Sequence, residues 1–427
     1  MFENAFVLFV PSVVKLKGKE EAMTILKDRK ILLGVTGGIA AYKALELTRL
    51  LALAEARVRV IMTQSAMEFV QPLSFQVLSG QPVCTHLFDL EAESRIGHIQ
   101  VATDAEVAVI APATANIIGK LAHGIADDYL TTALLVCTAP KIICPAMNVN
   151  MYESLVVQEN LARLRGWGFH QVGPEAGDLA CGVRGLGRLA PVDEILECIQ
   201  QALTPQSLQG KRVLVTAGPT KESLDPVRHL TNPSSGKMGY ALARAAKWRG
   251  AEVTLVSGPC SLAPPHRVSL IRVTSAQEMY EAVVDQFAQT DAVVMAAAVS
   301  DYRPKKKAPE KIKKIKVSES LQLEKTEDIL LRLGELKQRQ ILVGFAAETE
   351  NLLENAKVKL RQKNLDFIVA NDLTAANTGF ESDTNEVTIV WPGDEVENLS
   401  QKSKEAIAME IWDRVERLWQ KQKHVDS

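Results

Sequence analysis

Two strand–glycine-turn–helix units constrain the fold of this chain more than any other feature. The first runs from the apolar stretch Ile31–Val35 through a glycine turn at residues 36–38 into a helical pattern. The second runs from Arg212–Val215 through a longer loop, Ala217–Gly239, into a helical pattern from Tyr240. A β-branched stretch follows each unit and predicts a parallel strand. Since such a unit directs backbone N–H groups and a helix N-terminus at one point, we expect two phosphate-binding domains.

The composition agrees with two ordinary globular domains. The chain has 427 residues, 47% of them hydrophobic, and its net charge of −2 offers no basic excess for nucleic acid. The six cysteines show no spacing typical of a zinc site or a disulfide framework, so we expect a protein of the reducing cytoplasm. The apolar stretch Ala5–Val14 is too short to span a bilayer and has no basic start. Residues 1–28 are therefore predicted to be an N-terminal extension, and no membrane partner is expected.

Strand patterns alternate with helical patterns along the chain. This alternation predicts an α/β protein with two doubly wound domains, in which helices cover both faces of parallel sheets. A polar stretch containing Pro205 and Gly210 follows the helical pattern Val192–Leu203 and is typical of a linker. We predict domains at 29–203 and 211–427, joined by a linker at 204–210. Trp412 and Trp419, at helical spacing, are predicted to lie in a core. The predicted strands are Ile31–Val35, Val58–Met62, Val107–Ile110, Lys141–Cys144, Arg212–Val215, Val253–Val256, Ala292–Met295, Ile341–Gly344, Phe367–Val369 and Val387–Trp391.

Neither glycine turn matches a common nucleotide fingerprint. The pattern G-x-G-x-x-G is absent from the first, and the strand after it ends at Met62-Thr63-Gln64 without an acidic residue for a ribose diol. The second, at Gly236-Lys237, lacks the upstream glycine and the following Ser or Thr of a P-loop. By themselves, the turns leave a phosphate site and a tight helix start as open alternatives.

A lysine-rich run, Lys305–Lys316, follows a strand pattern whose extension ends at Asp301. Runs of charge are usually solvated loops. This run, however, comes at the carboxyl end of a strand, where α/β proteins bind ligands and where lysines can clamp a polyphosphate. We therefore favour the polyphosphate interpretation.

The segment Gly177–Gly187 contains Cys181 and is too rich in glycine for a core element. It suggests a flap, and a thiol on a flap is a candidate for redox chemistry or proton transfer. Single residues such as His98 and Asn148 are by themselves more often structural.

Taken together, residues 29–427 resemble the bacterial bifunctional phosphopantothenoylcysteine decarboxylase/phosphopantothenate–cysteine ligase family of coenzyme A biosynthesis. Several long motifs occur in the family's order across nearly the whole chain. They are Gly34–Lys43, Gly97–Ile99, Pro145–Tyr152, Ala180–Leu189, Ala217–Gly239, Ala297–Arg303, Pro309–Lys314, Gly344–Thr349 and Lys363–Asp372.

For the first half, the resemblance implies a flavodoxin-like FMN domain. FMN needs no acidic residue for a ribose diol, in agreement with the strand end at Thr63. His98 matches the family's active-site base, Asn148 the residue that holds the substrate carboxylate, and Cys181 the proton donor on the flap. The residues that match flavin contacts are Thr36, Gly37, Gly38, Ile39, Thr63, Ser65, Ala113, Thr114 and Asn116.

The implied chemistry explains why a flavin is needed. Loss of CO2 from the cysteine moiety would leave an unstabilised carbanion, and oxidation of the substrate thiol to a thioaldehyde provides an electron acceptor. Cys181 would then supply the proton when the resulting enethiol is reduced. Leu189 stands where relatives often carry Met, and we expect little effect from this difference.

For the second half, the resemblance implies a Rossmann-like ligase domain. This domain would activate 4'-phosphopantothenate with CTP as an acyl-cytidylate, which cysteine attacks; Mg2+ or Mn2+ would assist. Asn232 matches the residue that binds the activated intermediate, Lys311 the catalytic nucleotide-contacting lysine, and Asp301 a metal and nucleotide contact. The further residues that match nucleotide contacts are Ala297, Lys325, Asp328, Phe345, Lys359 and Lys363. The segment Lys325–Asp328 departs from the family's usual pattern.

Two other functions remain open on the sequence: a non-catalytic flavin-binding regulatory subunit, and a monofunctional ligase with a degenerate flavin domain. His98, Asn148 and Cys181 are all present, which favours the bifunctional enzyme over both. The resemblance also implies a homo-oligomer with trimeric decarboxylase and dimeric ligase contacts, which together would give a dodecamer.

Overall fold

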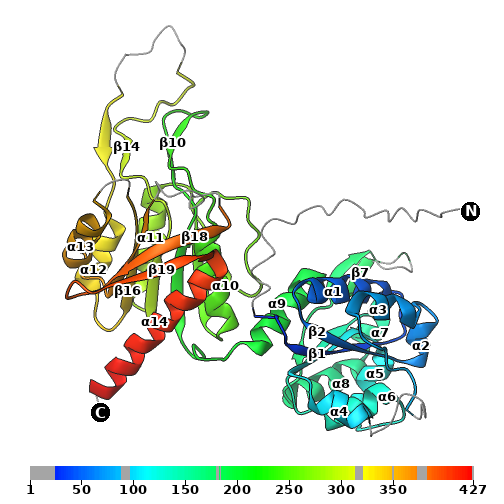
Figure 1. The fold of residues 1–427 in the computed structure, drawn as a ribbon. Coiled ribbons are helices and arrows are strands. Elements are labelled where there is room, and N and C mark those ends of the chain that lie inside the picture. Colours follow the sequence, from blue (N-terminus) through cyan, green and yellow to red (C-terminus); the bar gives the residue numbers. More distant parts are fainter. Residues whose placement is uncertain are drawn as a thin grey trace, which may run out of the picture.

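The computed structural model describes residues 25–87, 97–178, 182, 184–312, 321–348, 351–372 and 382–425. It contains two α/β domains, seen on the right and left of Figure 1, and the polypeptide passes from one to the other after α9 (Val192–Leu203). Helix α9 has the bounds predicted from the sequence. Within the described residues, no helix has both the length and the hydropathy that crossing a bilayer requires.

The N-terminal domain is built on a five-stranded parallel sheet with the order β2-β1-β3-β4-β5. This is the flavodoxin-like order, in which the chain changes direction between β1 and β3. The register places Val35 beside Met62, so the ends of β1 and β2 meet at one edge. The strands are β1 (Lys30–Val35), β2 (Arg57–Met62), β3 (Val107–Ala113), β4 (Lys141–Pro145) and β5 (His170–Gln171).

Helices cover both faces of this sheet, as the alternating pattern predicts (Figure 1). One apolar core includes Leu47, Phe75 and Ile195 from α1, α3 and α9, and Leu26 is buried in it three residues before the predicted domain start. The other core includes Ile118 from α5. The helices of this domain are α1 (Ala41–Leu53), α2 (Gln64–Met67), α3 (Pro72–Ser79), α4 (Gly97–Thr103), α5 (Ala115–Ala122), α6 (Tyr129–Val136), α7 (Val149–Glu153) and α8 (Leu155–Gly166).

The C-terminal domain has an eight-stranded sheet with the order β12-β11-β8-β13-β16-β17-β18-β19. Its first six strands are parallel and follow the Rossmann order, with the change of direction between β8 and β13. The prediction of parallel sheets is confirmed for these six strands, and two antiparallel strands, β18 and β19, extend the sheet at one edge. The strands are β8 (Arg212–Ala217), β11 (Glu252–Ser257), β12 (Ser269–Arg272), β13 (Ala292–Met295), β16 (Ile341–Glu348), β17 (Phe367–Asp372), β18 (Thr384–Val390) and β19 (Val396–Ser403).

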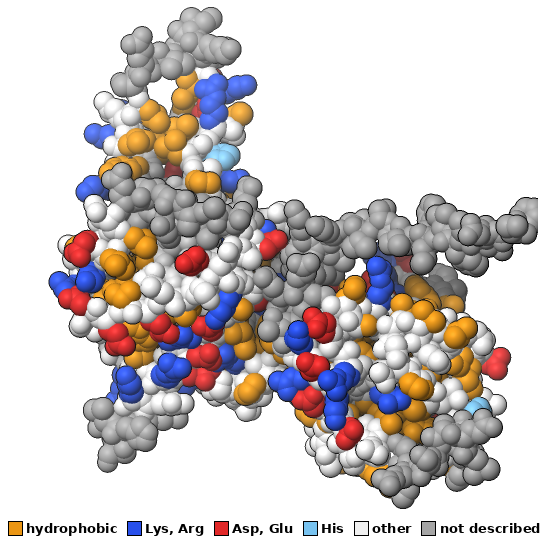
Figure 2. Space-filling view, in the orientation of Figure 1, with side chains coloured by type: hydrophobic (Ala, Val, Ile, Leu, Met, Phe, Trp, Pro, Cys, Tyr) orange, Lys and Arg blue, Asp and Glu red, His pale blue; other side chains and the backbone are white. Residues whose placement is uncertain are grey.

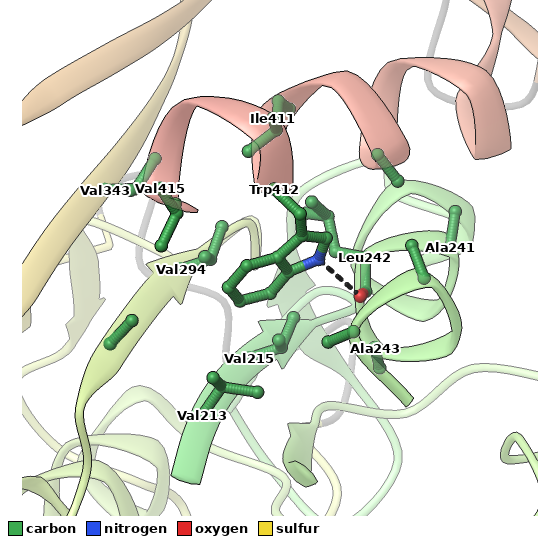
Figure 3. Close-up of a cluster of buried hydrophobic side chains, with 14 of the residues drawn as sticks. Val213, Val215, Ala241, Leu242, Ala243, Val294, Val343, Ile411, Trp412 and Val415 are labelled. Atoms are coloured by element: carbon green, nitrogen blue, oxygen red, sulfur yellow. Dashed lines mark hydrogen bonds between the residues drawn. The ribbon is translucent and has the colours of Figure 1, made fainter. Parts of the chain in front are cut away.

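The C-terminal helix α14 (Lys404–Val425) packs with α10 (Lys237–Trp248) on one face of this sheet. Trp412 is fully buried between the helices and strand residues such as Val294, and its indole N–H donates to the carbonyl of Leu242 at 2.9 Å (Figure 3). The core positions predicted for Trp412 and Trp419 are confirmed. The opposite face is covered by α11 (Ala276–Phe287), α12 (Ile329–Leu336) and α13 (Leu352–Gln362).

Two short hairpins form an arm at the carboxyl edge of this sheet, at the top of Figure 1. Strands β9 (Lys221–Ser223) and β10 (His229–Thr231) make the first, and β14 (Tyr302–Pro304) and β15 (Leu323–Lys325) the second. We call these two hairpins with their connecting turns the arm. The sequence did not predict the arm, because strands of three residues are too short to show a period.

Polar contacts join the two domains. Glu197 of α9 pairs with Arg244 of α10 at 3.4 Å and accepts the backbone N–H of His266 at 2.9 Å. Arg267 donates to the carbonyl of Gln171 at 3.0 Å. The first domain is therefore held against the second through α9 and β5.

Candidate functional sites

A cavity of about 1050 Å³ lies at the carboxyl edge of the N-terminal sheet, where the strand order reverses. Ligands of α/β domains bind at this position, and the volume suits a cofactor-sized molecule. The cavity brings together all but one of the predicted flavin-binding residues, together with Asn148. The predicted residues that line it are Thr36, Gly37, Gly38, Ile39, Thr63, Ser65, Thr114, Asn116 and Asn148.

The glycine turn between β1 and α1 forms one wall of this cavity. A Cβ on Gly37 would lie 2.4 Å from the Cβ of Ser65 and 2.7 Å from its carbonyl carbon, so only glycine fits there. In the described part of the chain, the backbone N–H groups of Gly37, Gly38 and Ile39 have no hydrogen-bond acceptor. Helix α1 follows with no side-chain cap and no acidic residue in its first turn. These features suit a phosphate group.

The hydroxyl groups of two threonines in the cavity differ in their hydrogen bonding. The buried hydroxyl of Thr36 donates to the carbonyl of Pro112 at 2.7 Å and accepts the N–H of Thr114 at 3.1 Å. It therefore ties the end of β1 to the end of β3. The hydroxyl of Thr63, which directly follows β2, is buried and has no hydrogen-bond partner among the residues that the structure describes. A buried hydroxyl without a partner is costly, and a ligand in the cavity would satisfy it.

A short hairpin of β6 (Glu175–Asp178) and β7 (Arg184–Arg188) closes another side of the cavity. The carbonyl of Gly187 accepts the N–H of Met147 at 2.9 Å, and a Cβ on Gly187 would lie only 2.1 Å from the carbonyl oxygen of Met147. This contact holds the hairpin beside Asn148, the N-cap of α7, whose side chain accepts the N–H of Asn150 at 2.9 Å.

Charged side chains that the sequence analysis missed also line the cavity. Lys120 lies 2.7 Å from Asp127 and 3.2 Å from Asp128; the hydrogen bond to Asp127 contributes most to raising the pKa of this lysine. Burial lowers the pKa of Lys43, and the nearby positive charge of Arg188 lowers it further. Lys120, Asp127 and Asp128 lie outside the motifs of the resemblance, so only the fold places them at the site. Lys43 and Arg188 lie within two of these motifs, but the sequence analysis gave them no role.

The mouth of the cavity is apolar. Ile39, Tyr42 and Met151 line it and are 61%, 58% and 48% exposed. Apolar side chains of this size are normally buried, so their exposure at a site marks a surface that contacts a ligand or another protein.

Three predicted residues of this half are not seen in the cavity. Ala113 is fully buried in β3 and does not line it. Cys181 lies outside the described residues, as does the side chain of His98. Helix α4, which carries His98, contributes Gln100 and Val101 to a different cavity of about 690 Å³.

In the C-terminal domain, glycines bring three loops together at the carboxyl ends of β8 and β11. A Cβ on Gly239 would lie 2.5 Å from the Cβ of Ala217, so α10 packs directly on the end of β8. A Cβ on Gly258 would lie 1.9 Å from the carbonyl oxygen of Pro219. Gly236 has φ of +79°, and a Cβ on it would lie 3.3 Å from the nitrogen of Gly218. Such close backbone approaches at a Rossmann switch point are typical of nucleotide sites.

The segment that follows β13 contacts Asn232 and contains Asp301. The side-chain amide of Asn232 donates to the carbonyl of Val299 at 3.0 Å. The carbonyl of Asp301 accepts the N–H of Thr326 at 3.0 Å, and the Asp301 side chain is exposed. The N–H of Ala297 donates to the hydroxyl of Thr216 at 3.1 Å. The fold thus brings Asn232 and Ala297, two residues predicted from the resemblance, to one edge of the sheet with Asp301.

The other predicted nucleotide contacts are more scattered. Lys311 and Lys325 are exposed on the arm, and Phe345 is half-buried in β16. Lys363 ends α13 and pairs at 2.8 Å with Asp328, the N-cap of α12. Lys359 lies one turn earlier on α13.

The sequence analysis missed two polar residues near this edge. Ser300 is 5% exposed. Neither its hydroxyl nor the side-chain oxygen of Asn371, near the end of β17, has a hydrogen-bond partner within the described part of the chain. Among the described residues, no group of three His, Cys, Asp or Glu side chains could hold a metal. A divalent cation at Asp301 would therefore need ligands from the bound nucleotide, as is usual for Mg2+.

Comparisons with known proteins cover both halves. A family model described as "Flavoprotein" matches residues 19–204, and one described as "DNA/pantothenate metabolism flavoprotein C-terminal domain" matches residues 208–418. The "Coenzyme A biosynthesis bifunctional protein CoaBC" of Vibrio parahaemolyticus is 45% identical, covering 93% of this chain and 100% of the relative. The protein of that name from Bacillus subtilis is 49% identical, with 91% and 96% covered.

Among solved structures, a crystal structure of the C-terminal domain of a coenzyme A biosynthesis bifunctional protein CoaBC is 47% identical. It covers 51% of this chain and 99% of that chain, with a TM-score of 0.44. The two full-length relatives each span both domains of this chain. The chain therefore belongs to the family of bifunctional coenzyme A biosynthesis proteins.

Proposed function

We propose that this chain catalyses two consecutive reactions of coenzyme A biosynthesis. The C-terminal domain ligates 4'-phosphopantothenate with cysteine, using CTP, and the N-terminal domain decarboxylates phosphopantothenoylcysteine to 4'-phosphopantetheine with FMN. The observation that carries this proposal is the cavity that gathers nearly all of the predicted flavin residues with Asn148. The full-length relatives support the pairing of the two activities on one chain.

The residues of the N-terminal cavity fit FMN. We assign the phosphate to the N–H groups of Gly37, Gly38 and Ile39, and one hydrogen bond to the free hydroxyl of Thr63. Ser65, Thr114 and Asn116 would complete the wall. When bound, FMN supplies the oxidation of the substrate thiol that makes loss of CO2 possible.

The chain's own residues would position the substrate and move its protons. Asn148 would hold the substrate carboxylate, because its side chain lines the cavity at the start of α7. His98 would act as the base, and Cys181 on the β6–β7 connection would donate the last proton. Both roles come from the family resemblance.

In the ligase domain, Asn232 would bind the acyl-cytidylate, and Lys311 would stabilise charge on the α-phosphate. Asp301 would hold Mg2+ or Mn2+ together with the nucleotide phosphates. The further nucleotide contacts that we propose are Ala297, Lys325, Asp328, Phe345, Lys359 and Lys363. Since Asp328 and Lys363 form one ion pair, a nucleotide phosphate would have to replace the carboxylate as the partner of Lys363.

We also propose that the chain forms a homo-oligomer through trimeric contacts of the first domain and dimeric contacts of the second. In support, Leu73 and Val77 on α3 are 67% and 73% exposed, and Leu155 at the start of α8 is 79% exposed. Val227 and Tyr302 on the arm are also exposed, and Figure 2 shows hydrophobic side chains gathered there. A trimer would let a neighbouring subunit complete the apolar mouth of the flavin cavity.

The domain limits that we propose are those of the sequence analysis: an extension over 1–28, domains over 29–203 and 211–427, and a linker over 204–210. Residues 1–24 of the extension lie outside the described residues. A cytoplasmic location fits the cysteines, because none of those described forms a disulfide.

One assay on the purified protein tests both activities. Phosphopantothenate, cysteine, CTP and Mg2+ are mixed, with ATP replacing CTP in a parallel tube, and the products are identified by mass spectrometry. We expect phosphopantetheine, CO2 and pyrophosphate from a protein with a flavin absorbance spectrum.

Replacing Cys181 with Ser (Cys181→Ser) is expected to leave decarboxylation intact but to accumulate the oxidised enethiol.

Other products would support the other functions. Phosphopantothenoylcysteine alone, from a colourless protein, would identify a monofunctional ligase. A folded flavoprotein that makes no product would identify a regulatory subunit. Normal product at the normal rate from Cys181→Ser would contradict the role of that thiol.

A further inference from the structure

Asp225 is a buried carboxylate on the turn between β9 and β10. It lies within the motif Ala217–Gly239, but neither the sequence analysis nor the proposed mechanism gives it a role. Its side chain is 0% exposed, which is unusual for an aspartate. A buried carboxylate needs hydrogen-bond donors around it. The donors of Asp225 come from two segments that lie far apart in the sequence.

The first oxygen of Asp225 organises its own turn. Oδ1 accepts the N–H of Val227 at 2.7 Å and the N–H of Arg228 at 2.8 Å. These bonds to residues two and three positions ahead are typical of an aspartate that shapes a turn. The turn leads through β10 directly to Asn232.

The second oxygen of Asp225 binds the lysine-rich segment. Oδ2 accepts the backbone N–H of Ile312 at 3.2 Å, and the guanidinium of Arg228 lies 3.8 Å away. Nearby, the N–H of Ala308 donates to the carbonyl of Leu224 at 2.9 Å. These two bonds bracket residues 309–311, so the backbone that carries Lys311 is fixed on the turn of Asp225.

The environment keeps this carboxylate charged. Burial by itself would raise the pKa of Asp225, but the N–H groups of Val227, Arg228 and Ile312 and the charge of Arg228 outweigh it and lower the pKa. A charged acceptor makes stronger hydrogen bonds than a neutral one. The link to Ile312 is therefore present throughout the neutral pH range.

We propose that Asp225 is a positioning residue of the ligase reaction, which fixes the Lys311 segment against the β9–β10 hairpin so that Lys311 and Asn232 serve one site. Asn232 is held at the other end of the hairpin by its bond to Val299. The inference rests on the proposed function, because it assumes that Lys311 contacts the nucleotide.

Asp225→Asn tests this link with little other change. The amide oxygen can keep the bonds to Val227 and Arg228, while the amide nitrogen faces the N–H of Ile312, donor against donor. Asp225→Ser is the second variant, since its short hydroxyl can support the turn but cannot reach Ile312. Asp291→Asn is the matched control, because Asp291 also accepts a backbone N–H, that of Arg212 at 2.7 Å, but at the opposite edge of the sheet.

The readout is the steady-state kinetics of the ligase, with pyrophosphate release in the absence of cysteine as the partial reaction. For Asp225→Asn and Asp225→Ser, we expect KM for CTP to rise about tenfold and pyrophosphate release to slow, with KM for phosphopantothenate within about twofold of wild type. Asp291→Asn should behave as wild type. Decarboxylation of added phosphopantothenoylcysteine and the thermal unfolding profile show that each variant is folded.

Combination with Lys311→Ala separates the inference from the proposed function. If Asp225 acts through Lys311, adding Asp225→Asn to Lys311→Ala should cause no further loss. Independent, multiplicative losses would overturn the positioning role, as would wild-type CTP kinetics in both Asp225 variants.

If Lys311→Ala alone leaves CTP kinetics unchanged, the nucleotide role proposed for Lys311 is wrong, and the inference fails with it. An equal rise of KM for both substrates would show a general structural effect and would also overturn it.

Discussion

At the scale of single residues, we expect substitutions of the two cavity threonines to affect the stability of the apoprotein in opposite directions. Thr36 satisfies its hydroxyl within the chain, whereas Thr63 does not. We expect Thr63→Val to leave the free energy of unfolding of the apoprotein unchanged or to raise it by about 1 kcal/mol, since it removes a buried unsatisfied hydroxyl. The same change should weaken FMN binding about tenfold, because the ligand loses a hydrogen bond.

Thr36→Val is the matched comparison, because it should destabilise the apoprotein by about 1–2 kcal/mol through two lost hydrogen bonds. Chemical denaturation of flavin-free protein and fluorescence titration with FMN measure the two quantities. A Thr63→Val protein that is less stable than wild type without flavin would contradict the assignment of its hydroxyl to the ligand.

At the scale of elements, the β6–β7 hairpin depends on Gly187. A Cβ at this position would lie 2.1 Å from the carbonyl oxygen of Met147, so Gly187→Ala must push the hairpin away from α7. We expect decarboxylation to fall at least tenfold, because the hairpin closes the cavity and leads to Cys181, while ligase activity is unchanged. Limited proteolysis should cut the hairpin sooner.

Gly166→Ala is the control for this prediction. Gly166 ends α8 in the same domain, and a Cβ there would meet no atom within 4 Å. If Gly187→Ala and Gly166→Ala decarboxylate equally fast, the hairpin has no part in the reaction.

At the scale of the whole molecule, exposed apolar side chains on the N-terminal domain predict subunit contacts. Leu73 and Val77 lie four residues apart on α3 and form one apolar stripe. We expect Leu73→Glu combined with Val77→Glu to lower the molar mass in solution and the decarboxylase activity, but not the ligase activity. Light scattering after size-exclusion chromatography measures the mass.

Gln76→Glu places a single negative charge on the same helix without removing either apolar side chain, and should change neither mass nor activity. An unchanged mass for the double variant would show that α3 is not an interface. A lower mass with full decarboxylase activity would show that the flavin site is complete within one subunit.

The sequence predicted the central parallel strands well, because each is a continuous apolar run buried on both faces. The parallel edge strands β5 and β12 were missed, because they are short and only partly buried. Most observed strands extend these runs by one to three residues at their ends, as β3 does to Ala113 and β17 does to Asp372. The antiparallel direction of β18 and β19 was not predicted, because the alternation of apolar and polar residues along a strand is the same for parallel and antiparallel pairing. The short strands of the arm were missed because they are held by turns and by the long-range bond to Asp225.

The sequence by itself determined the architecture of two doubly wound domains and the positions of their glycine turns. Close backbone contacts require glycine at positions such as Gly37, and these glycines can be identified in the sequence. Only the tertiary structure decided which polar groups are left for a ligand, as for Thr63 but not Thr36, and which distant segments share a site, as for Asp225 and Ile312. The physical reason is that strand register and helix packing bring together residues whose spacing along the chain carries no period, and that the partner of a polar group depends on everything packed around it.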